Sequence, residues 1–213
     1  MSKKKIAIQG ELGAYSHIAA ENLFKGSEIK TCITFEETFK EAYNDPNYKI
    51  VIPIENSLAG RVADIHYLLP KYKLQIHGEH FQTVEHNLLG KQEASLSDIK
   101  YVRSHAQAIG QCQNLIIKKN FKPIISADTA GSAKDLAEGK DKTIAAIASE
   151  LSAKIYNLKI LEKNIEDEKG NVTRFLIMGK NIEQPEFKKE KKFITSCIFR
   201  VKSEPSALYK CLG

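Results

Sequence analysis

Short apolar runs alternate along the chain with segments of helical periodicity. Residues 4–9 (KKIAIQ) precede the helical pattern of residues 17–25, and residues 49–54 (KIVIPI) precede the helical pattern of residues 61–69. In both cases a cluster of small polar residues separates the two segments, as expected where a strand turns into a helix. Each pair of segments therefore predicts one strand followed by one helix.

The same unit recurs three times further along. Its copies are residues 101–103 with the helix 106–120, residues 124–126 with the helix 130–139, and residues 143–148 with the helix 150–157. Asn157 fits the left-handed residue that often ends a helix. Strands that alternate with helices of about ten residues predict an α/β fold with mostly parallel sheets.

The polar clusters between strands and helices predict a ligand site. Ligands of open α/β sheets bind outside the carboxyl ends of the strands, where free backbone N–H groups at helix starts favour an anion. Ser16, Ser57, Ser104 and Thr129 are each placed to cap such a helix start. Any one of them is explained as a structural cap, but four together favour a carboxylate-binding cleft.

Composition narrows the choice of partners. Apolar residues make up 42% of the 213 residues, which allows one domain or two small lobes with a real core. Lys and Arg outnumber Asp and Glu by 32 to 26, but much of the excess lies in residues 3–5 and 188–192. The sequence shows no stripe of basic residues interleaved with aromatic residues, so a nucleic-acid partner is not indicated. The charge is compatible with small anionic ligands.

Asn171-Val172-Thr173 fits the N-glycosylation pattern of secreted proteins. Against secretion, Gln9 interrupts the N-terminal apolar run after three residues, which is too short for an export signal. The four cysteines have no paired spacing and suit reduced thiols. No apolar run reaches the roughly 18 residues of a membrane span. We therefore predict a cytoplasmic protein without membrane association, in which the glycosylation pattern is accidental.

Two local motifs indicate no cofactor or metal. Residues 10–16 (GELGAYS) follow a strand and open a helix, but their G-x-x-G spacing does not match the dinucleotide fingerprint. Residues 77–80 (HGEH) lack the spacing of a helical metal pair, and we predict a solvated loop there.

Five motifs together resemble a known family. They are GELGAYSHIAA, PIENSLAGRV, SHAQAIGQC, DTAGSAKDLA and GNVTRF, in this order over about residues 5–180. In this order and spacing they resemble the prephenate dehydratase family, which includes the arogenate dehydratases. Two details depart from the family pattern: Ala106 replaces a frequent proline, and Glu166 replaces the usual glutamine.

The resemblance implies a two-lobed α/β catalytic domain, similar to type II periplasmic binding proteins, with the substrate between the lobes. We expect the catalytic domain in residues 1–180, with one lobe in about residues 3–76 plus 171–179 and the other in about residues 84–165. The implied reaction removes water and carbon dioxide from prephenate to leave phenylpyruvate, without metal or organic cofactor. Arogenate is the alternative substrate, and a cytosolic small-anion-binding module without chemistry is the alternative function.

The resemblance assigns the catalytic role to Thr173. An aliphatic hydroxyl is a very weak acid, so Thr173 can act as a hydrogen-bond donor or relay to the leaving hydroxyl group. Glu55 and His105 are the alternatives, since their pKa values can be tuned. Glu55 also fits an acidic residue in the first turn of a helix, and His105 a neighbour of a cap.

Further residues would contact the substrate by the same resemblance. Arg174 matches the geometry of a carboxylate, but strand alternation puts it on the face opposite to Thr173 and Phe175. Phe175 would supply an apolar wall, or it is a core residue. The remaining polar lining is Ser16, Asn56, Ser57, Ser104, Gln107 and Thr129.

The composition changes after Gly179. Residues 181–192 read as a charged linker. Residues 193–213 resemble the first strand and helix of an ACT-type regulatory domain, so we expect a truncated regulatory domain. L-phenylalanine would be an allosteric effector only with the full domain. The family resemblance implies a homodimer or tetramer.

Overall fold

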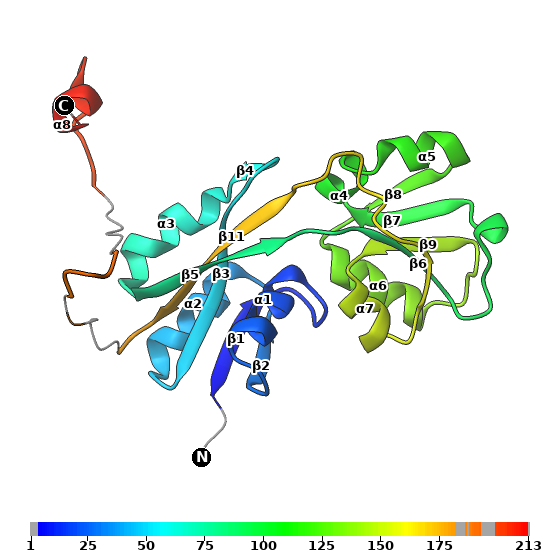
Figure 1. Ribbon diagram of the computed structural model, residues 1–213, viewed down its shortest axis with the longest axis horizontal. Coiled ribbons are helices and arrows are strands. Elements are labelled where there is room, and N and C mark those ends of the chain that lie inside the picture. Colours follow the sequence, from blue (N-terminus) through cyan, green and yellow to red (C-terminus); the bar gives the residue numbers. More distant parts are fainter. Residues whose placement is uncertain (1–3, 182–185, 187, 193–198, 213) are drawn as a thin grey trace. The chain divides into compact units, whose positions relative to one another are not determined.

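The structure of the chain is a computed structural model that describes residues 4–181, 186, 188–192 and 199–212. Residues 1–182 form one compact unit and residues 183–213 form another. The first unit contains two β-sheets with their helices, which we call the first and the second lobe (Figure 1). This arrangement confirms the predicted two-lobed α/β fold.

The first lobe is built on the strand order β2-β1-β3-β11-β5, with the short strand β4 paired to β3. The strands are β1 (Lys5–Gln9), β2 (Glu28–Cys32), β3 (Tyr48–Asn56), β4 (Gly60–Arg61), β5 (Gln75–Thr83) and β11 (Val172–Gly179). β1 is parallel to β2 and β3, whereas β11 is antiparallel to β3 and β5. The prediction of mostly parallel sheets is wrong here, because the chain leaves the lobe along β5 and returns along β11.

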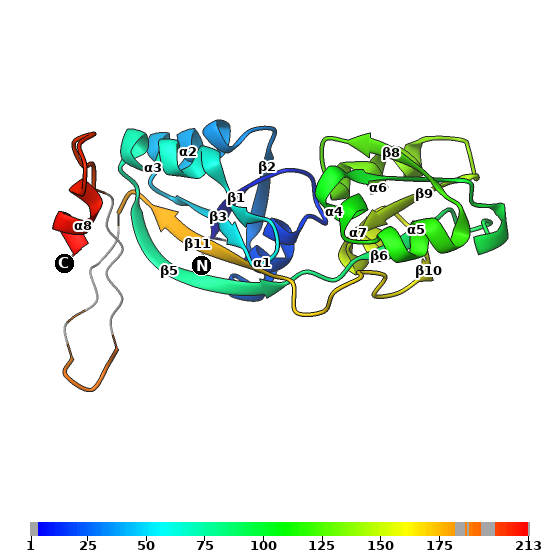
Figure 2. The ribbon, with the colours of Figure 1, turned by 90° about the horizontal axis from the view of Figure 1, so that it is seen from above.

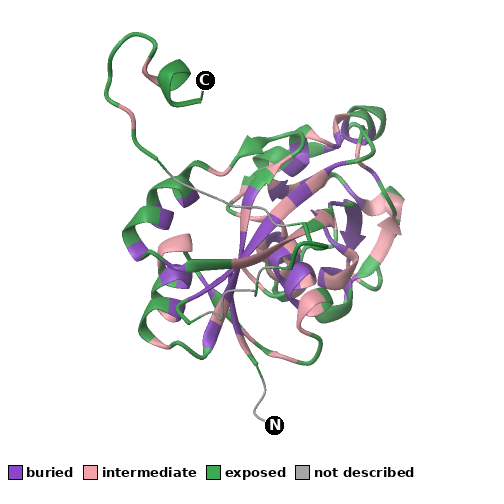
Figure 3. Cartoon of the chain, turned by 60° about the vertical axis from the view of Figure 1, so that its left-hand side comes forward, coloured by how far each residue is buried: buried purple, intermediate pink, exposed green. Residues whose placement is uncertain are grey.

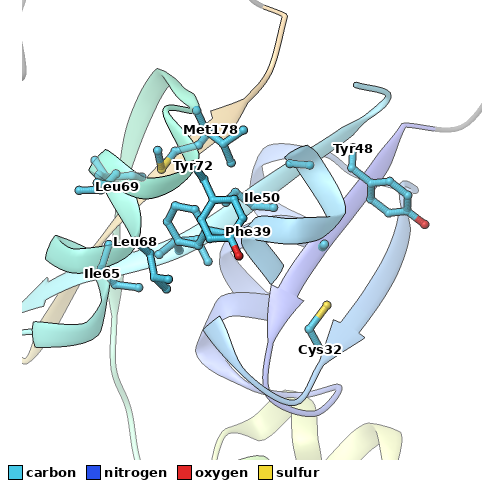
Figure 4. Close-up of a cluster of buried hydrophobic side chains, with 14 of the residues drawn as sticks. Cys32, Phe39, Tyr48, Ile50, Ile65, Leu68, Leu69, Tyr72 and Met178 are labelled. Atoms are coloured by element: carbon cyan, nitrogen blue, oxygen red, sulfur yellow. The ribbon is translucent and has the colours of Figure 1, made fainter. Parts of the chain in front are cut away.

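Side-chain alternation gives this sheet two apolar faces. Helix α1 (Tyr15–Leu23) packs on one face through Ala19 and Ala20, against Ile6, Ile8 and Phe175. Helices α2 (Phe35–Asn44) and α3 (Ala63–Tyr72) pack on the other face. Figure 4 shows the cluster on that second face, which includes Phe39, Ile50, Ile65, Tyr72 and Met178.

The second lobe has the strand order β10-β6-β9-β7-β8. Its strands are β6 (Asn87–Gly90), β7 (Tyr101–His105), β8 (Lys122–Ser126), β9 (Ile144–Ala148) and β10 (Lys159–Glu162). Its helices are η1 (Leu96–Asp98), α4 (Ala106–Gly110), α5 (Gln113–Lys119), α6 (Thr129–Glu138) and α7 (Glu150–Ile155). Residues of α4 and α5 belong to one apolar cluster, and residues of α6 and α7 belong to another. Asn157 follows α7 with a φ of 52°, the left-handed conformation that the sequence predicted.

Two segments connect the lobes and run beside each other (Figure 2). The backbone N–H of Val84 donates to Asn171 O at 2.8 Å, and that of Ile165 donates to His86 O at 2.8 Å. The outward segment follows β5, which extends to Thr83, beyond the lobe boundary that we expected near residue 76. Residues 77–80 are therefore part of a strand paired to β11, and the predicted solvated loop is wrong. Their polar character is compatible with a strand because β5 lies at the edge of the sheet.

The predicted helix 106–120 is two helices, α4 and α5, separated by Gln111 and Cys112. The carboxylate of Asp167 accepts hydrogen bonds from the backbone N–H groups of Gln113 (2.8 Å) and Asn114 (3.0 Å). This carboxylate satisfies donors at the start of α5 and so provides a second helix start inside the helical pattern.

The four predicted cap residues do not cap helices. The N-cap of α1 is Ala14, and Ser16 lies inside the helix. Asp128 and not Thr129 caps α6, through a bond from Gly131 N. Ser57 lies between β3 and β4, and Ser104 lies in β7. The error arises because a small polar cluster marks the junction of strand and helix but does not specify which of its residues has the cap conformation.

The second unit contains α8 (Ala207–Leu212), which has no buried residue and is exposed in Figure 3. The predicted strand from residue 193 falls largely on residues 193–198, which lie outside the described residues. Among the described residues, no helix has the length and apolar character needed to cross a membrane.

Candidate active site

The hydroxyl of Thr173 lies at the start of β11 and is almost buried, with 8% of the residue exposed. Its oxygen accepts a hydrogen bond from Asn56 Nδ2 at 2.9 Å. Asn56 is the register partner of Thr173 on β3, so both side chains lie on the same face of the sheet. The other amide atom, Asn56 Oδ1, accepts from the backbone N–H groups of Leu58 (3.0 Å) and Ala59 (2.9 Å). Thr173 is thus held by an amide that is itself fixed by the backbone.

Polar side chains continue this contact away from Thr173. Asn56 Nδ2 donates to Asn171 Oδ1 at 2.6 Å, and Asn171 Nδ2 donates to Gln111 Oε1 at 2.9 Å. The same Gln111 oxygen lies 2.9 Å from Nε2 of His86. The other ring nitrogen, His86 Nδ1, lies 3.1 Å from the hydroxyl of Tyr15. We call these six residues, from Thr173 to Tyr15, the amide network.

Burial sets the electrostatics at the far end of the amide network. His86 is 3% exposed, and this burial lowers its pKa, partly offset by Gln111 and by Glu166. Burial also raises the pKa of Tyr15 well above the ordinary value. Both side chains are therefore neutral near pH 7. The network presents hydrogen bonds at that end rather than charges.

The opposite face of β11 has different chemistry. Arg174 Nη1 lies 3.1 Å from Glu55 Oε1, and Arg174 Nη2 lies 2.7 Å from Glu79 Oε2. Arg174 and Glu55 are register partners, one position away from Thr173 and Asn56. The bond to Glu55 is the main reason that the pKa of Arg174 is raised. The structure therefore separates Glu55 and Arg174 from Thr173 by the thickness of the sheet, as alternation predicted for Arg174.

Phe175 returns to the face of Thr173 but lies deeper. It is 1% exposed and packs with Ile6, Ile8 and Val51 under helix α1. Of the two interpretations of this residue, the structure favours the core phenylalanine over the cleft wall.

The return segment is also fastened to β3 by Ser57. Its hydroxyl accepts from Val172 N at 3.0 Å and donates to Gly170 O at 3.4 Å. The hydroxyl of Ser57 thus positions the segment that carries Thr173.

In the second lobe, the predicted site residues have unequal access to solvent. Ser104 is fully buried and donates to Ile147 O at 2.7 Å. His105 is the N-cap of α4, where its Nδ1 accepts from Gln107 N at 3.3 Å. Gln107 is exposed, and His105 and Thr129 are half-buried. Three of these four predicted residues are therefore accessible to a ligand.

The loop between β1 and α1 contacts the second lobe directly. Gly13 O accepts from the hydroxyls of Ser149 (2.6 Å) and Ser152 (3.1 Å). Gly13 has a φ of +92°, and a Cβ there would lie 2.4 Å from Ser152 Oγ. A side chain at residue 13 would thus be strained by the backbone conformation and would clash with α7. Glu11 of the same loop forms an ion pair with Lys134 on α6 at 3.1 Å.

A hollow of about 550 Å³ lies between α1, the end of β5 and α7. None of the predicted site residues lines it. Among its lining residues, Tyr15 belongs to the amide network and Gln82 is the register partner of Thr173. The hollow therefore begins beside the predicted site, at the Tyr15 end of the network.

Comparison with known proteins identifies the family. The sequence profile described as "Prephenate dehydratase" matches residues 6–183. The chain belongs to the prephenate dehydratase family. It is 40% identical over 211 residues to the "Bifunctional N-acyl-homoserine lactone acylase/prephenate dehydratase" of Komagataeibacter europaeus, covering 98% of this chain and 74% of that protein.

Two further comparisons bear on substrate and fold. "Arogenate dehydratase/prephenate dehydratase 2, chloroplastic" of Arabidopsis thaliana is 37% identical, covering 100% of this chain and 55% of that protein. A crystal structure of prephenate dehydratase from Arthrobacter aurescens in complex with L-Phe has a TM-score of 0.79 and 25% identity, covering 86% of this chain and 63% of that one. The chain thus spans about half to three quarters of the length of these prephenate dehydratase relatives.

Sequence reasoning missed part of the amide network. Asn171, Gln111, His86 and Tyr15 were not among the predicted site residues. Asn171 and Gln111 do lie within motifs of the prephenate dehydratase family, GNVTRF and SHAQAIGQC, and this membership is the available signal. A prediction from helix starts selects Ser and Thr at the junctions and passes over amides, and the glycosylation pattern offered a separate explanation for Asn171.

Proposed function

We propose that the chain catalyses the decarboxylating dehydration of prephenate to phenylpyruvate, a step in the biosynthesis of phenylalanine. Family membership supports this activity. The observation that carries it is the hydrogen bond from Asn56 Nδ2 to Thr173 Oγ1 at 2.9 Å. Because the oxygen of Thr173 is an acceptor in this contact, its own proton is free to be donated to a substrate.

The donated hydrogen bond would act on the ring hydroxyl that leaves as water. In the reaction the bond between the ring and its carboxylate breaks, its electrons complete the aromatic ring, and the C–O bond of the hydroxyl breaks. Prephenate dianion and one proton give the phenylpyruvate anion, carbon dioxide and water. Since the pKa of an aliphatic hydroxyl is far above 7, Thr173 donates the hydrogen bond and solvent supplies the proton. A positioned proton or hydrogen-bond donor of this kind typically raises the reaction rate about 100-fold to 10,000-fold.

The accessible predicted residues are candidates for binding the two carboxylates. We assign this role to His105, Gln107 and Thr129 in the second lobe. Ser16 is only 7% exposed and is left out of the assignment. Hydroxyl, amide and imidazole donors suit carboxylate oxygens. Glu55, Ser57, Ser104, Arg174 and Phe175 have no place in this assignment, because each is on the other face, engaged in the fold, or buried.

The experiment is product analysis with the purified chain at neutral pH. With prephenate we expect phenylpyruvate, and with arogenate as the alternative substrate we expect phenylalanine. The faster of the two reactions identifies the substrate. If neither product forms above the uncatalysed rate while calorimetry still detects substrate binding, the chain is a small-anion-binding module instead.

Location and regulation extend the proposal. We propose a cytoplasmic protein, since the described cysteines 32, 112 and 211 are free thiols.

We propose that residues 193–213 begin an ACT-type regulatory domain. L-phenylalanine, which is bound in the Arthrobacter aurescens structure, would then act only on a chain with the whole domain. A homodimer or tetramer is testable by light scattering.

A further inference from the structure

The hydrogen atoms of the amide network have an order that can be followed from the backbone of residues 58 and 59 as far as His86. The backbone N–H groups of Leu58 and Ala59 can only donate, so the amide atom of Asn56 that faces them is the oxygen. The nitrogen of Asn56 therefore faces Asn171 and Thr173. The two hydrogens on this nitrogen go to Asn171 Oδ1 at 2.6 Å and Thr173 Oγ1 at 2.9 Å.

The order continues across the return segment to the second lobe. Since the oxygen of Asn171 is used by Asn56, its nitrogen donates to Gln111 Oε1 at 2.9 Å. That oxygen can only accept, and it also lies 2.9 Å from His86 Nε2. His86 must therefore carry a proton on Nε2. If the proton were on Nδ1 alone, the lone pairs of His86 Nε2 and Gln111 Oε1 would face each other. If Gln111 turned its amide to avoid this, its N–H group would instead face the N–H group of Asn171.

His86 is held so that it can maintain this contact. Its backbone N–H donates to Glu166 Oε2 at 3.0 Å. The hydroxyl of Tyr15 lies 2.6 Å from Glu85 O and 3.1 Å from Nδ1, so with Nδ1 unprotonated its one proton is shared between these two acceptors. The residue is in the outward segment, and its ring nitrogen contacts Gln111 at the end of α4. The ring therefore connects the segment that joins the lobes to a helix of the second lobe.

We propose that His86 is a positioning residue for the dehydration. As the Nε2–H tautomer it holds the oxygen of Gln111 towards Asn171, and so maintains the order that leaves the hydroxyl proton of Thr173 free. This inference rests on the proposed function. His86 does not touch the reacting atoms but acts through three amides.

The tautomer is measurable without turnover. At neutral pH, ¹⁵N NMR of the imidazole rings should show His86 with a protonated Nε2 and an unprotonated Nδ1. The resonance is assigned by its loss in His86→Asn. Asn171→Asp replaces the donor that faces Gln111 by an acceptor, so Gln111 should turn its nitrogen to that carboxylate and His86 should become the Nδ1–H tautomer. An Nδ1–H tautomer in the natural protein, or no change in Asn171→Asp, overturns the proposal.

Kinetics tests the role in the reaction. His86→Asn cannot reach Gln111 and should lower kcat roughly tenfold, about the value of one hydrogen bond, with little change in KM. His86→Gln places an amide nitrogen near the position of Nε2 and should recover part of the loss. His66→Asn on the exposed side of α3 is the matched control and should not change kcat.

The outcomes separate the two proposals. If a folded His86→Asn protein has the same kcat as the unsubstituted protein, the positioning role is refuted. Equal losses in His86→Asn and His86→Gln also refute it, because a donor at Nε2 would then be irrelevant. If the natural chain forms no product, the proposed function and with it the kinetic role are refuted, while the NMR spectra still decide the order of the network.

Discussion

Thr173 and Arg174 are neighbours in one motif, but the two faces of β11 give them opposite surroundings. On one face Thr173 accepts a hydrogen bond from an amide and keeps its proton. On the other face Arg174 is paired with Glu55 and Glu79. A motif that is continuous in sequence is therefore divided by the pleat into a part suited to chemistry and a part suited to joining strands. Substitutions on the two faces should have separable effects.

The largest expected effect on stability is at Phe175, which shares the face of Thr173 but lies in the core. Phe175→Ala removes a buried ring between α1 and the sheet. We expect the free energy of unfolding to fall by about 3–5 kcal/mol, as measured by denaturant titration. Turnover per folded molecule should be little affected. Normal stability with lost turnover would instead make Phe175 a wall of the cleft.

The largest expected effect on catalysis short of Thr173 itself is at Asn56. Asn56→Asp keeps an acceptor for Leu58 N and Ala59 N but presents a second acceptor to Thr173, which would then donate its proton to the carboxylate. We expect kcat to fall about 100-fold or more in steady-state assays. Asn44→Asp, at an exposed position in the last turn of α2, is the control. If Asn56→Asp had the same kcat as the unsubstituted protein, the hydroxyl proton of Thr173 would have no role in the reaction.

A smaller effect is expected on the other face. Glu55→Gln breaks one ion pair and Arg174→Gln breaks two, all between partly exposed side chains, and such pairs contribute about 1 kcal/mol or less each. We expect a slight loss of thermal stability and little change in kcat. If Glu55→Gln abolished turnover, Glu55 would be the acid and the division between the faces would be wrong.

The last expected effect appears only at acidic pH and lies towards the other end of the β5/β11 pair. Burial, with a contribution from Lys49, lowers the pKa of His77 in the folded protein from 6.5 to about 4. Between these values the unfolded chain binds a proton that the folded chain does not, so stability should fall as the pH falls from about 6.5 to about 4. His77→Gln should flatten the profile of unfolding free energy in this range. An unchanged profile would show that His77 is not responsible.

The sequence could predict the features that depend on local periodicity. The alternation of strands and helices indicated the α/β fold, and the two-residue repeat of a strand separated Arg174 from Thr173. The cap residues could not be predicted, because Ser16 and Ser104 satisfy the same composition rule inside a helix and a strand. Strand β5 was missed because an edge strand does not need an apolar pattern.

The amide network was beyond local reasoning for a different cause. Asn56 and Asn171 are 115 residues apart in sequence, and Gln111 and Asn171 are 60 apart. Each is an ordinary polar residue within its own segment. They come together only in the folded protein. There β11 pairs with β3, and the residues just before β11 contact the second lobe.

In the proposed mechanism, the free hydroxyl proton of Thr173 accelerates loss of the ring hydroxyl group. The most direct test is single-turnover conversion of prephenate by Thr173→Val, which keeps the shape of the side chain and removes the hydroxyl. Thr173→Ser is measured beside it, and Thr31→Val, at an exposed position of β2, is the control. We expect Thr173→Val to bind substrate but to react at least about 100-fold more slowly than the unsubstituted protein, Thr173→Ser to keep partial activity, and the control to react at the unsubstituted rate. An unsubstituted rate in Thr173→Val would contradict this mechanism.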